Sequence, residues 1–467
     1  MLKIHVVRQG GHLYYVHDLV PGRAELSPVA GEEPGVWVGS APGALGLGGR
    51  VESAPFADVL EGRHPLSGRT LRKQRGPRSA AGFDLTFCAP KSVSLLHLLA
   101  PGEIASEVGA GHQAAVGGAI DYLGREGVGV RRTRKGETAH LASTGMVAGQ
   151  FLHRTSRTLD PHLHTHVVAA NLAEGVDGAW SAVDSRRLFS HLGAAQALYH
   201  ARLRLELGHR IGAAWEVRPT GLGDVVGVDT GLRRLFSQRS ASMDEYRFLQ
   251  AGPDHAAVTP RAAFHAERPE KNGSVTVDEL RSQWRRRAAE LGFDLGDLTR
   301  AVGPHRDRRF APVIDHRAVA DRLGELARRQ RTIARHQLVA LVASSAPGGA
   351  DARSVESMTS RWLEASGLAL ADQARGLPGS GRSERWEAAA VGRTVEAEPV
   401  GAVGSERAGW PMERSRWGSG VPAPDGRSFG GRGPVAVAFG IDLPPLTTGH
   451  TASWDLDRSD RSLSMDR

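Results

Sequence analysis

The chain has 467 residues, and its 59 lysines and arginines against 51 aspartates and glutamates give a formal net charge of +8. A single cysteine, Cys88, excludes internal disulfides and cysteine-based zinc sites, and no apolar run approaches the roughly 18 residues that a membrane-spanning helix needs. We therefore expect a cytoplasmic protein of about two or three units, with a basic balance that favours a polyanionic partner such as nucleic acid.

Three zones follow one another along the chain. Residues 1–240 mix short apolar runs with glycine-rich turns, which predicts an α+β domain. Residues 241–345 have helical periodicity and many basic side chains, which predicts a helical extension. Residues 346–467 are rich in Gly, Pro, Arg and Ser without sustained periodicity. Such a composition buries too little apolar surface to offset the entropy of ordering, so a disordered tail is predicted.

The first residues that suggest chemistry are the adjacent Tyr14 and Tyr15. Adjacent tyrosines are usually core or interface residues, and alone they prove little. A tyrosine oxygen can also attack phosphorus and form a covalent ester where a metal ion stabilises charge on the phosphoryl oxygens. Both interpretations remain open from the residues alone.

A strand is predicted just after Gly82, where apolar and polar residues alternate. One face carries Phe83, Leu85 and Phe87, and the other carries Asp84, Thr86 and Cys88. An aspartate on a central strand is unfavourable without a partner, and the second nitrogen of a metal-bound imidazole would be such a partner. The alternative for Asp84 is an N-cap or a charge on an edge strand. Cys88 is interpreted as a small core residue.

A helix is expected to begin at Lys91-Ser92, after Pro90 ends that strand. The amides at the start of a helix have no partner within it and attract anions. Together with the cation of Lys91, this helix start is therefore suited to a phosphate.

Four histidines lie close together further along. The run from Leu163 to Leu172 reads as a strand in which His164 and His166 share one face. His153 follows the apolar run from Met146 to Leu152, which predicts the neighbouring strand. Three imidazoles on adjacent strands can hold a divalent ion, although isolated histidines are more often packing or hydrogen-bonding groups. His162 shares the same parity, so the third ligand is ambiguous from the residues alone.

The extension contains predicted helix boundaries. Thr276 and Glu279 have the spacing of a capping box, and Gly292 supplies a stop signal. Between them, Leu280, Trp284 and Leu291 are expected on one helical face. Two further helix starts are predicted at Ser242 with Glu245 and at Thr259-Pro260.

Three segments in this order resemble the relaxase domain of conjugative plasmid transfer proteins of the MobF class (TrwC/TraI type), in an actinobacterial-like form. The segments are Tyr14-Tyr15, Gly82–Leu98 and Phe151–Phe189, the last including Trp180-Ser181-Ala182-Val183-Asp184. The resemblance extends from residue 1 to about residue 345. It implies an HUH endonuclease fold, with an antiparallel sheet flanked by helices and a helical extension that closes over single-stranded DNA.

The resemblance also assigns roles to residues. It places the metal on His153, His164 and His166, which decides against His162 as the third ligand. It places the acidic residue of the site at Asp84 and the nucleophile in the Tyr14-Tyr15 pair, with Tyr14 the first choice. The implied metal is one divalent ion, Mg²⁺ or Mn²⁺ first, with Zn²⁺, Ni²⁺ or Co²⁺ as alternatives.

The reaction that the resemblance implies is a strand-specific transesterification at a plasmid origin of transfer. Tyrosine attacks the scissile phosphate, releases a 3′-hydroxyl and remains bound to the 5′-phosphate. Relaxosome accessory proteins and a coupling protein are the implied partners. The alternatives are a catalytically silent single-stranded DNA-binding remnant and a metal-dependent phosphodiesterase in which water attacks.

Two features depart from the family pattern. The second tyrosine cluster of many relatives is absent from Arg23–Ser27, which favours a mechanism based on Tyr14 and Tyr15. The printed sequence also contains no Walker A run, G-x-x-x-x-G-K-[S/T], so we expect a relaxase without its own helicase and without ATP.

Contacts with DNA phosphates are expected from the basic side chains, although charge runs on helices are more often solvated faces. The candidates are Lys91, Arg131, Arg132, Arg134, Lys135, Arg154, Arg157, Arg285, Arg286, Arg287, Arg306, Arg308 and Arg309.

Overall fold

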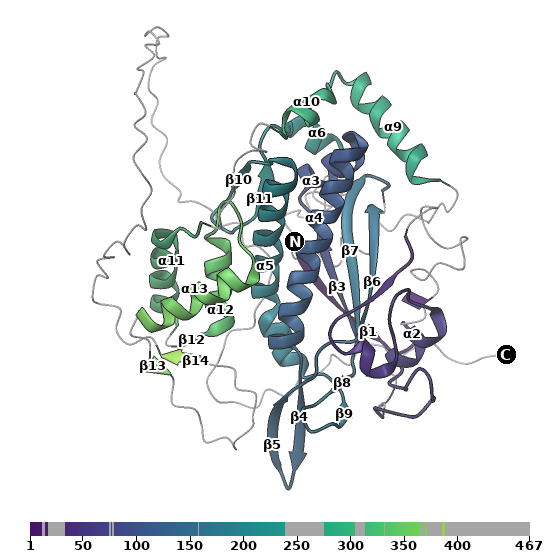
Figure 1. Ribbon diagram of the computed structural model, residues 1–467, viewed down its shortest axis with the longest axis vertical. Helices are drawn as coiled ribbons and strands as arrows, with labels where there is room; N and C mark the ends of the chain where they lie inside the picture. The colour runs from purple at the N-terminus through teal and green to yellow at the C-terminus, as the bar shows by residue number, and fades with distance from the viewer. Residues whose placement is uncertain are drawn as a thin grey trace, which may run out of the picture. The chain divides into compact units, whose positions relative to one another are not determined.

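The structure is a computed structural model of the chain (Figure 1). It describes residues 1–11, 15–16, 33–73, 76, 79–156, 158–238, 275–303, 313–330, 332–365, 369–370 and 385–387. All of these residues lie in one compact unit, Met1–Glu396. The expected domain boundary near residue 240 and most of the expected tail lie outside the described residues. Within the described part, no helix has both the length and the apolar character that a membrane span requires.

A five-stranded antiparallel sheet forms the centre, in the order β1-β3-β7-β6-β2. Its strands are β1 (Leu2–Arg8), β2 (Val36–Val38), β3 (Ala80–Cys88), β6 (Ala148–Thr155) and β7 (Pro161–Ala170). The α+β class and the antiparallel sheet predicted from the sequence are therefore confirmed. β3 and β7 lie inside the sheet, each with a paired strand on both sides.

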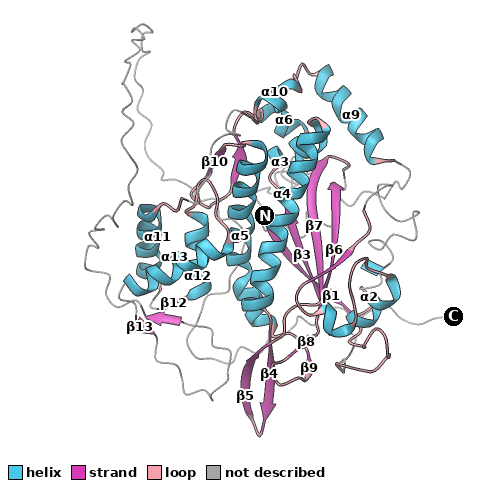
Figure 2. Cartoon of the chain, in the orientation of Figure 1, coloured by secondary structure: helices cyan, strands magenta, loops and turns pink. Residues whose placement is uncertain are grey.

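One face of the sheet packs against helices α3 (Lys91–Leu99), α4 (Gly102–Tyr122) and α5 (Ser185–Ile211), which run alongside the strands in Figure 2. The predicted alternation of β3 explains this packing. Phe83, Leu85 and Phe87 are at most 2% exposed and belong to the main core with these helices. The alternating side chains of β3 therefore point to the other face of the sheet.

The second face has a smaller core of its own. The short helix η1 (Pro42–Leu45) and helix α2 (Ser53–Leu60) contribute to it, and Phe56 of α2 contacts Phe151 of β6 edge to face. Tyr15 and Val168 belong to the same cluster. This face therefore has a packed end at α2, next to the polar residues of β3, β6 and β7.

A β-hairpin of β4 (Gly129–Arg134) and β5 (Glu137–Ala142) follows the short helix η2 (Leu123–Gly127). Lys135 and Gly136 at its tip both have positive φ, as a two-residue type I′ turn requires to match the right-handed twist of the strands. In Figure 1 the hairpin projects beyond the sheet at the end where β6 begins and β7 ends. A pair of short strands, β8 (Ala173–Glu174) and β9 (Trp180–Ser181), lies near its base.

The remaining described elements lie C-terminal to α5. They are β10 (Trp215–Val217), β11 (Gly223–Val225), α6 (Thr230–Leu235), α9 (Val277–Glu290), α10 (Gly296–Arg300), α11 (His316–Arg329), β12 (Thr332–Ala334), α12 (Arg335–Ser344), α13 (Ala352–Ala365), β13 (Ala369–Leu370) and β14 (Arg385–Glu387).

Helix α9 confirms the predicted capping box, because Thr276 and Glu279 exchange side-chain to backbone hydrogen bonds. Leu280 and Trp284 are buried, but Leu291 is 60% exposed, so its expected place on the same face is wrong. The helix ends at Glu290, and Leu291 already has non-helical angles before Gly292 turns the chain at φ +77°. The helix starts predicted at Ser242 and Thr259 lie outside the described residues.

Helix α13 falls inside the stretch 346–467 that composition assigns to a disordered tail. Val355, Thr359 and Leu363 are four residues apart and buried, so they form one helical face against the core. The expected start of the tail therefore differs from the structure over this helix. Averaged composition conceals a short amphipathic helix that precedes a Gly/Pro-rich segment.

Several histidines are buried in the helical layer. His112 joins three elements: its Nδ1 lies 2.9 Å from the Tyr199 hydroxyl and its Nε2 lies 2.8 Å from the Thr165 hydroxyl. Burial lowers the pKa of His112 to about 3, that of His191 to about 3 and that of His97 to about 4. These imidazoles therefore stay neutral in the folded protein at neutral pH.

Acid is expected to destabilise the fold well above the pH at which carboxylates titrate. Below pH about 6.5 the unfolded chain protonates these histidines and the folded chain does not. The free energy of unfolding therefore decreases by about 1.4 kcal/mol per histidine for each pH unit. Thermal unfolding followed by circular dichroism between pH 7.5 and 5.0 should show a midpoint that falls steadily with pH. A constant midpoint across this range would contradict the neutral, buried state of these side chains.

Candidate metal centre and catalytic site

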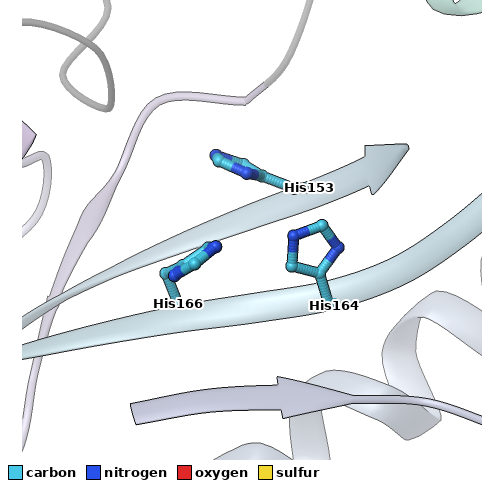
Figure 3. A group of neighbouring side chains, drawn as sticks. All are labelled: His153, His164 and His166. Atoms are coloured by element: carbon cyan, nitrogen blue, oxygen red, sulfur yellow. The ribbon is translucent and has the colours of Figure 1, made fainter. Parts of the chain in front are cut away.

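Three histidines meet on the second face of the sheet, at the end where β6 finishes and β7 begins (Figure 3). His153 of β6 lies directly opposite His164 of β7, and His166 is two residues further along β7. Directly opposed residues of antiparallel strands share a face, as do residues two apart on one strand. The candidate ligand atoms of the three side chains all lie within 4.8 Å of one another.

The hydrogen bonds of two of these rings determine which nitrogen carries the proton. Nδ1 of His164 lies 2.9 Å from the His162 carbonyl oxygen, and Nδ1 of His166 lies 2.9 Å from both carboxylate oxygens of Asp84. Those oxygens only accept, so each Nδ1 donates its proton, and in a neutral ring this leaves the lone pair on Nε2. A lone pair on Nε2 is what a metal ligand requires.

The protonation state of His164 also suits a metal ligand. Burial, followed by the nearby His166, lowers the pKa of His164 to about 3. The ring is therefore neutral at physiological pH, and a proton does not compete for its lone pair. Three imidazole nitrogen donors fit a divalent first-row ion with positions left open for a substrate oxygen.

His162 lies beside this group rather than in it. Its ring stacks on that of His164, with centroids 4.7 Å apart and planes at 26°. The three-residue group contains His153, His164 and His166, the set that the resemblance implies. The contribution of His162 is its carbonyl oxygen, which orients His164. No sequence signal reveals this contribution, because any residue at the position has a carbonyl.

Asp84 connects the histidines to a phenol. It lies on the interior strand β3 and is 4% exposed, so the alternatives of an N-cap or an edge-strand charge do not apply. Its carboxylate accepts hydrogen bonds from His166 and from the Tyr15 hydroxyl, the latter at 3.1 Å, and the Thr86 hydroxyl is 3.3 Å away. The buried charge therefore has the imidazole partner expected from the sequence.

Tyr15 is 8% exposed and belongs to the smaller core. Its hydroxyl ends a hydrogen-bonded path that runs through Asp84 to His166. Tyr14, the first choice for the nucleophile, lies outside the described residues. The structure thus brings one tyrosine of the pair to the candidate metal centre.

Many of the basic residues expected to contact DNA instead have partners within the protein. The Lys91 ammonium donates to the Pro161 carbonyl at 2.7 Å, and burial lowers its pKa to about 8. Arg154, with a side chain only 13% exposed, pairs with Glu33. Arg285 donates to the Leu99 carbonyl, and Arg287 lies over the Phe236 ring.

Of the basic residues in the β4–β5 hairpin, some likewise have acidic partners within the protein and others are exposed. Arg132 pairs with Asp177 at 2.7 Å, and Arg131 lies 3.6 Å from Asp184. Arg134 and Lys135 at the tip are exposed, as is Arg286 on α9. The hairpin lies at the end of β6 and β7 away from the histidines (Figure 1). Arg157, Arg306, Arg308 and Arg309 lie outside the described residues.

Comparison with known proteins identifies similarity to conjugative relaxases. A family model described as TrwC relaxase matches residues 9–291. The multifunctional conjugation protein TraI of Escherichia coli is 31% identical over 272 residues, and its homologue from strain K12 is 29% identical over 287 residues. These matches cover 56% and 58% of this chain but only 15% of each relative.

Solved structures give a corresponding result. Two structures of the conjugative relaxase TrwC in complex with oriT DNA, one metal-free and one metal-bound, superpose with TM-scores of 0.54 and 0.55 at 29% identity. A third, with a 27-mer DNA comprising the recognition hairpin and the cleavage site, has a TM-score of 0.54. Each match covers 63% of this chain and 100% of the TrwC chain.

Proposed function

Because the chain belongs to the TrwC relaxase family, we propose that it is a conjugative relaxase that nicks one strand of plasmid origin-of-transfer DNA. The observation that carries this proposal is the path from the Tyr15 phenol through Asp84 to the three-histidine group. The TrwC structures contain oriT DNA, which supports the same class of substrate here. Plasmid DNA is processed in the cytoplasm, which is therefore the proposed location.

The proposed reaction is a transesterification. A tyrosine oxygen forms a bond to the scissile phosphorus, the bond from phosphorus to the 3′ oxygen breaks, and that oxygen leaves as a 3′-hydroxyl after gaining a proton. The 5′-phosphate remains on tyrosine as a phosphodiester, so the strand can later be rejoined. A divalent ion held by His153, His164 and His166 would supply charge compensation at the non-bridging oxygens.

Asp84 serves two groups in this proposal. Toward His166, its carboxylate accepts a hydrogen bond from Nδ1–H and fixes the ring with Nε2 available to the metal. Toward the tyrosine pair, it is a nearby acceptor for a phenol proton, which is useful because an ordinary phenol has a pKa near 10. Both roles depend on the carboxylate being buried and hydrogen-bonded on β3.

We assign the attack to Tyr14 first. The Tyr15 hydroxyl is buried and already donates to Asp84, which supports a positioning role for that residue. The alternative is that Tyr15 itself attacks after its proton passes to Asp84, and single substitutions separate the two.

The metal and the other partners are also proposals. The resemblance favours Mg²⁺ or Mn²⁺, whereas three nitrogen donors alone suit Zn²⁺, Ni²⁺ or Co²⁺ better than Mg²⁺. Of the basic residues expected to contact DNA, Arg131 and Arg285 are exposed but interact with Asp184 and the Leu99 carbonyl. Arg134, Lys135 and Arg286 are also exposed and are the proposed phosphate contacts. A coupling protein and accessory relaxosome proteins are the proposed protein partners.

Incubation of the purified chain with a single-stranded oligonucleotide of its cognate origin and Mn²⁺ is expected to give a covalent protein–DNA adduct. A denaturing gel shows it as a slower-migrating band that resists detergent and disappears after protease treatment. Chelation with EDTA should abolish the band, and the complementary strand serves as the control. Binding without cleavage would instead identify a silent DNA-binding remnant, and cleavage without an adduct would identify a hydrolytic phosphodiesterase.

A further inference from the structure

The turn between β6 and β7 joins the two strands that carry the candidate metal ligands. His153 lies two residues before the end of β6 and His164 three residues after the start of β7, so they are the cross-strand ligand pair nearest the turn. The position of the turn therefore sets how closely these two rings approach each other.

The geometry of this turn is irregular. The strand register shifts between His153 and Thr155, so the ladder is interrupted beside a candidate ligand. Leu159 has φ +56°, a left-handed conformation that is unfavourable for a residue with a side chain. Conformations of this kind persist where surrounding contacts hold them.

Contacts from three other parts of the chain hold the turn. The Trp284 indole Nε1 of α9 donates to the Leu159 carbonyl at 2.9 Å. Gln238, just after α6, donates its backbone amide and its side-chain amide to the two carboxylate oxygens of Asp160, at 2.9 and 2.7 Å. At the start of α3, Lys91 donates to the Pro161 carbonyl at 2.7 Å.

Helix α9 is itself anchored near the turn. Its Arg281 and Arg285 donate to the carbonyls of Leu98 and Leu99 at the C-terminus of α3, a position where cations are favourable. Trp284 lies between them in sequence and is 4% exposed. The indole is thus held in a packed position, with its only polar atom directed at the backbone of Leu159.

We propose that Trp284 is a positioning residue for the metal centre, because its hydrogen bond fixes the turn that sets the spacing of His153 and His164. This inference rests on the proposed function and adds a structural link between the helical extension and the metal ligands. Gln238 acts on the same turn through Asp160. Sequence periodicity identifies Trp284 as a buried helix residue but gives no indication of this polar contact.

Substitution Trp284→Phe tests the inference, because it retains an aromatic ring and removes the indole donor. Calorimetric titration of the full-length variant with Mn²⁺, without DNA, is expected to show about threefold to tenfold weaker binding. This effect is smaller than that of removing a residue that hydrogen-bonds directly to a metal ligand. Gln238→Ala should weaken Mn²⁺ binding in the same direction, and it decides the question if Trp284→Phe does not fold.

A matched control is Trp362→Phe in α13. The Trp362 indole nitrogen is buried without a hydrogen-bond partner among the described residues, so this variant should bind Mn²⁺ as the unmodified chain does. Unchanged Mn²⁺ affinity in a folded Trp284→Phe variant, or in Gln238→Ala in its place, would overturn the inference. Absence of Mn²⁺ binding by the unmodified chain would contradict the proposed metal centre itself, and the inference with it.

Discussion

Substitution of both Tyr14 and Tyr15 with phenylalanine is expected to abolish the covalent adduct, with a loss of at least about a thousandfold in the rate of strand cleavage. The reason is chemical, since the phenol oxygen is the atom that bonds to phosphorus in the proposed reaction. Phenylalanine keeps the ring of Tyr15 in the smaller core, so the fold should survive. The adduct assay with the origin oligonucleotide and Mn²⁺ provides the measurement.

The single variants distinguish the two tyrosines. If Tyr14 attacks, Tyr14→Phe alone should remove the adduct. Tyr15→Phe should then leave slower but measurable cleavage, because Asp84 loses one donor and keeps His166. The opposite pattern would assign the attack to Tyr15. Cleavage that persists at the normal rate in the double variant would exclude tyrosine as the nucleophile and favour water.

The alternation of side chains along single strands explains why part of the site could be predicted from the sequence. The period-two alternation of β3 places Asp84 opposite the apolar face of Phe83 and Leu85, and the same period places His164 and His166 together. These relations depend only on strand geometry and hold wherever the strand forms. The pairing of His153 with His164 needed the register of β6, which the apolar run before His153 only suggests.

The arginines show where local pattern stops being informative. A run such as Arg285-Arg286-Arg287 indicates charge but not what lies opposite each side chain. In the structure Arg285 and Arg286 are both exposed, but the Arg285 guanidinium donates to the Leu99 carbonyl at the C-terminus of α3. Arg287 lies over the Phe236 ring. Those partners come from elements nearly 200 and about 50 residues away. Tertiary packing of α9 therefore decides which cations remain available for DNA.

The second large effect is expected from His164→Ala, which should eliminate strand cleavage while leaving DNA binding nearly unchanged. His164 is the direct cross-strand partner of His153 and has His166 on its own strand, so its removal leaves two donors of three. Loss of a ligand should weaken Mn²⁺ binding by about 100-fold or more. This is at least the effect of removing a residue that hydrogen-bonds to a ligand. Calorimetry measures the metal, and the adduct assay measures cleavage.

DNA binding should be spared for an electrostatic reason. Burial keeps the pKa of His164 at about 3, so the ring is neutral and its removal subtracts no positive charge from the DNA-binding surface. Affinity for phosphates depends mainly on cations, and a gel-shift titration without added metal ion should therefore give a dissociation constant within about threefold of the original. His164→Ala that still nicks DNA would remove the metal from the mechanism.

The matched control is His162→Ala, two residues earlier on the same strand and face. Its ring stacks on His164, but its carbonyl, which orients His164 Nδ1, remains in the alanine variant. Cleavage should therefore fall only modestly, and Mn²⁺ affinity should stay close to that of the unmodified chain. Equal losses in both variants would mean that this end of β7 contributes through packing alone, because only His164 belongs to the group whose nitrogens converge.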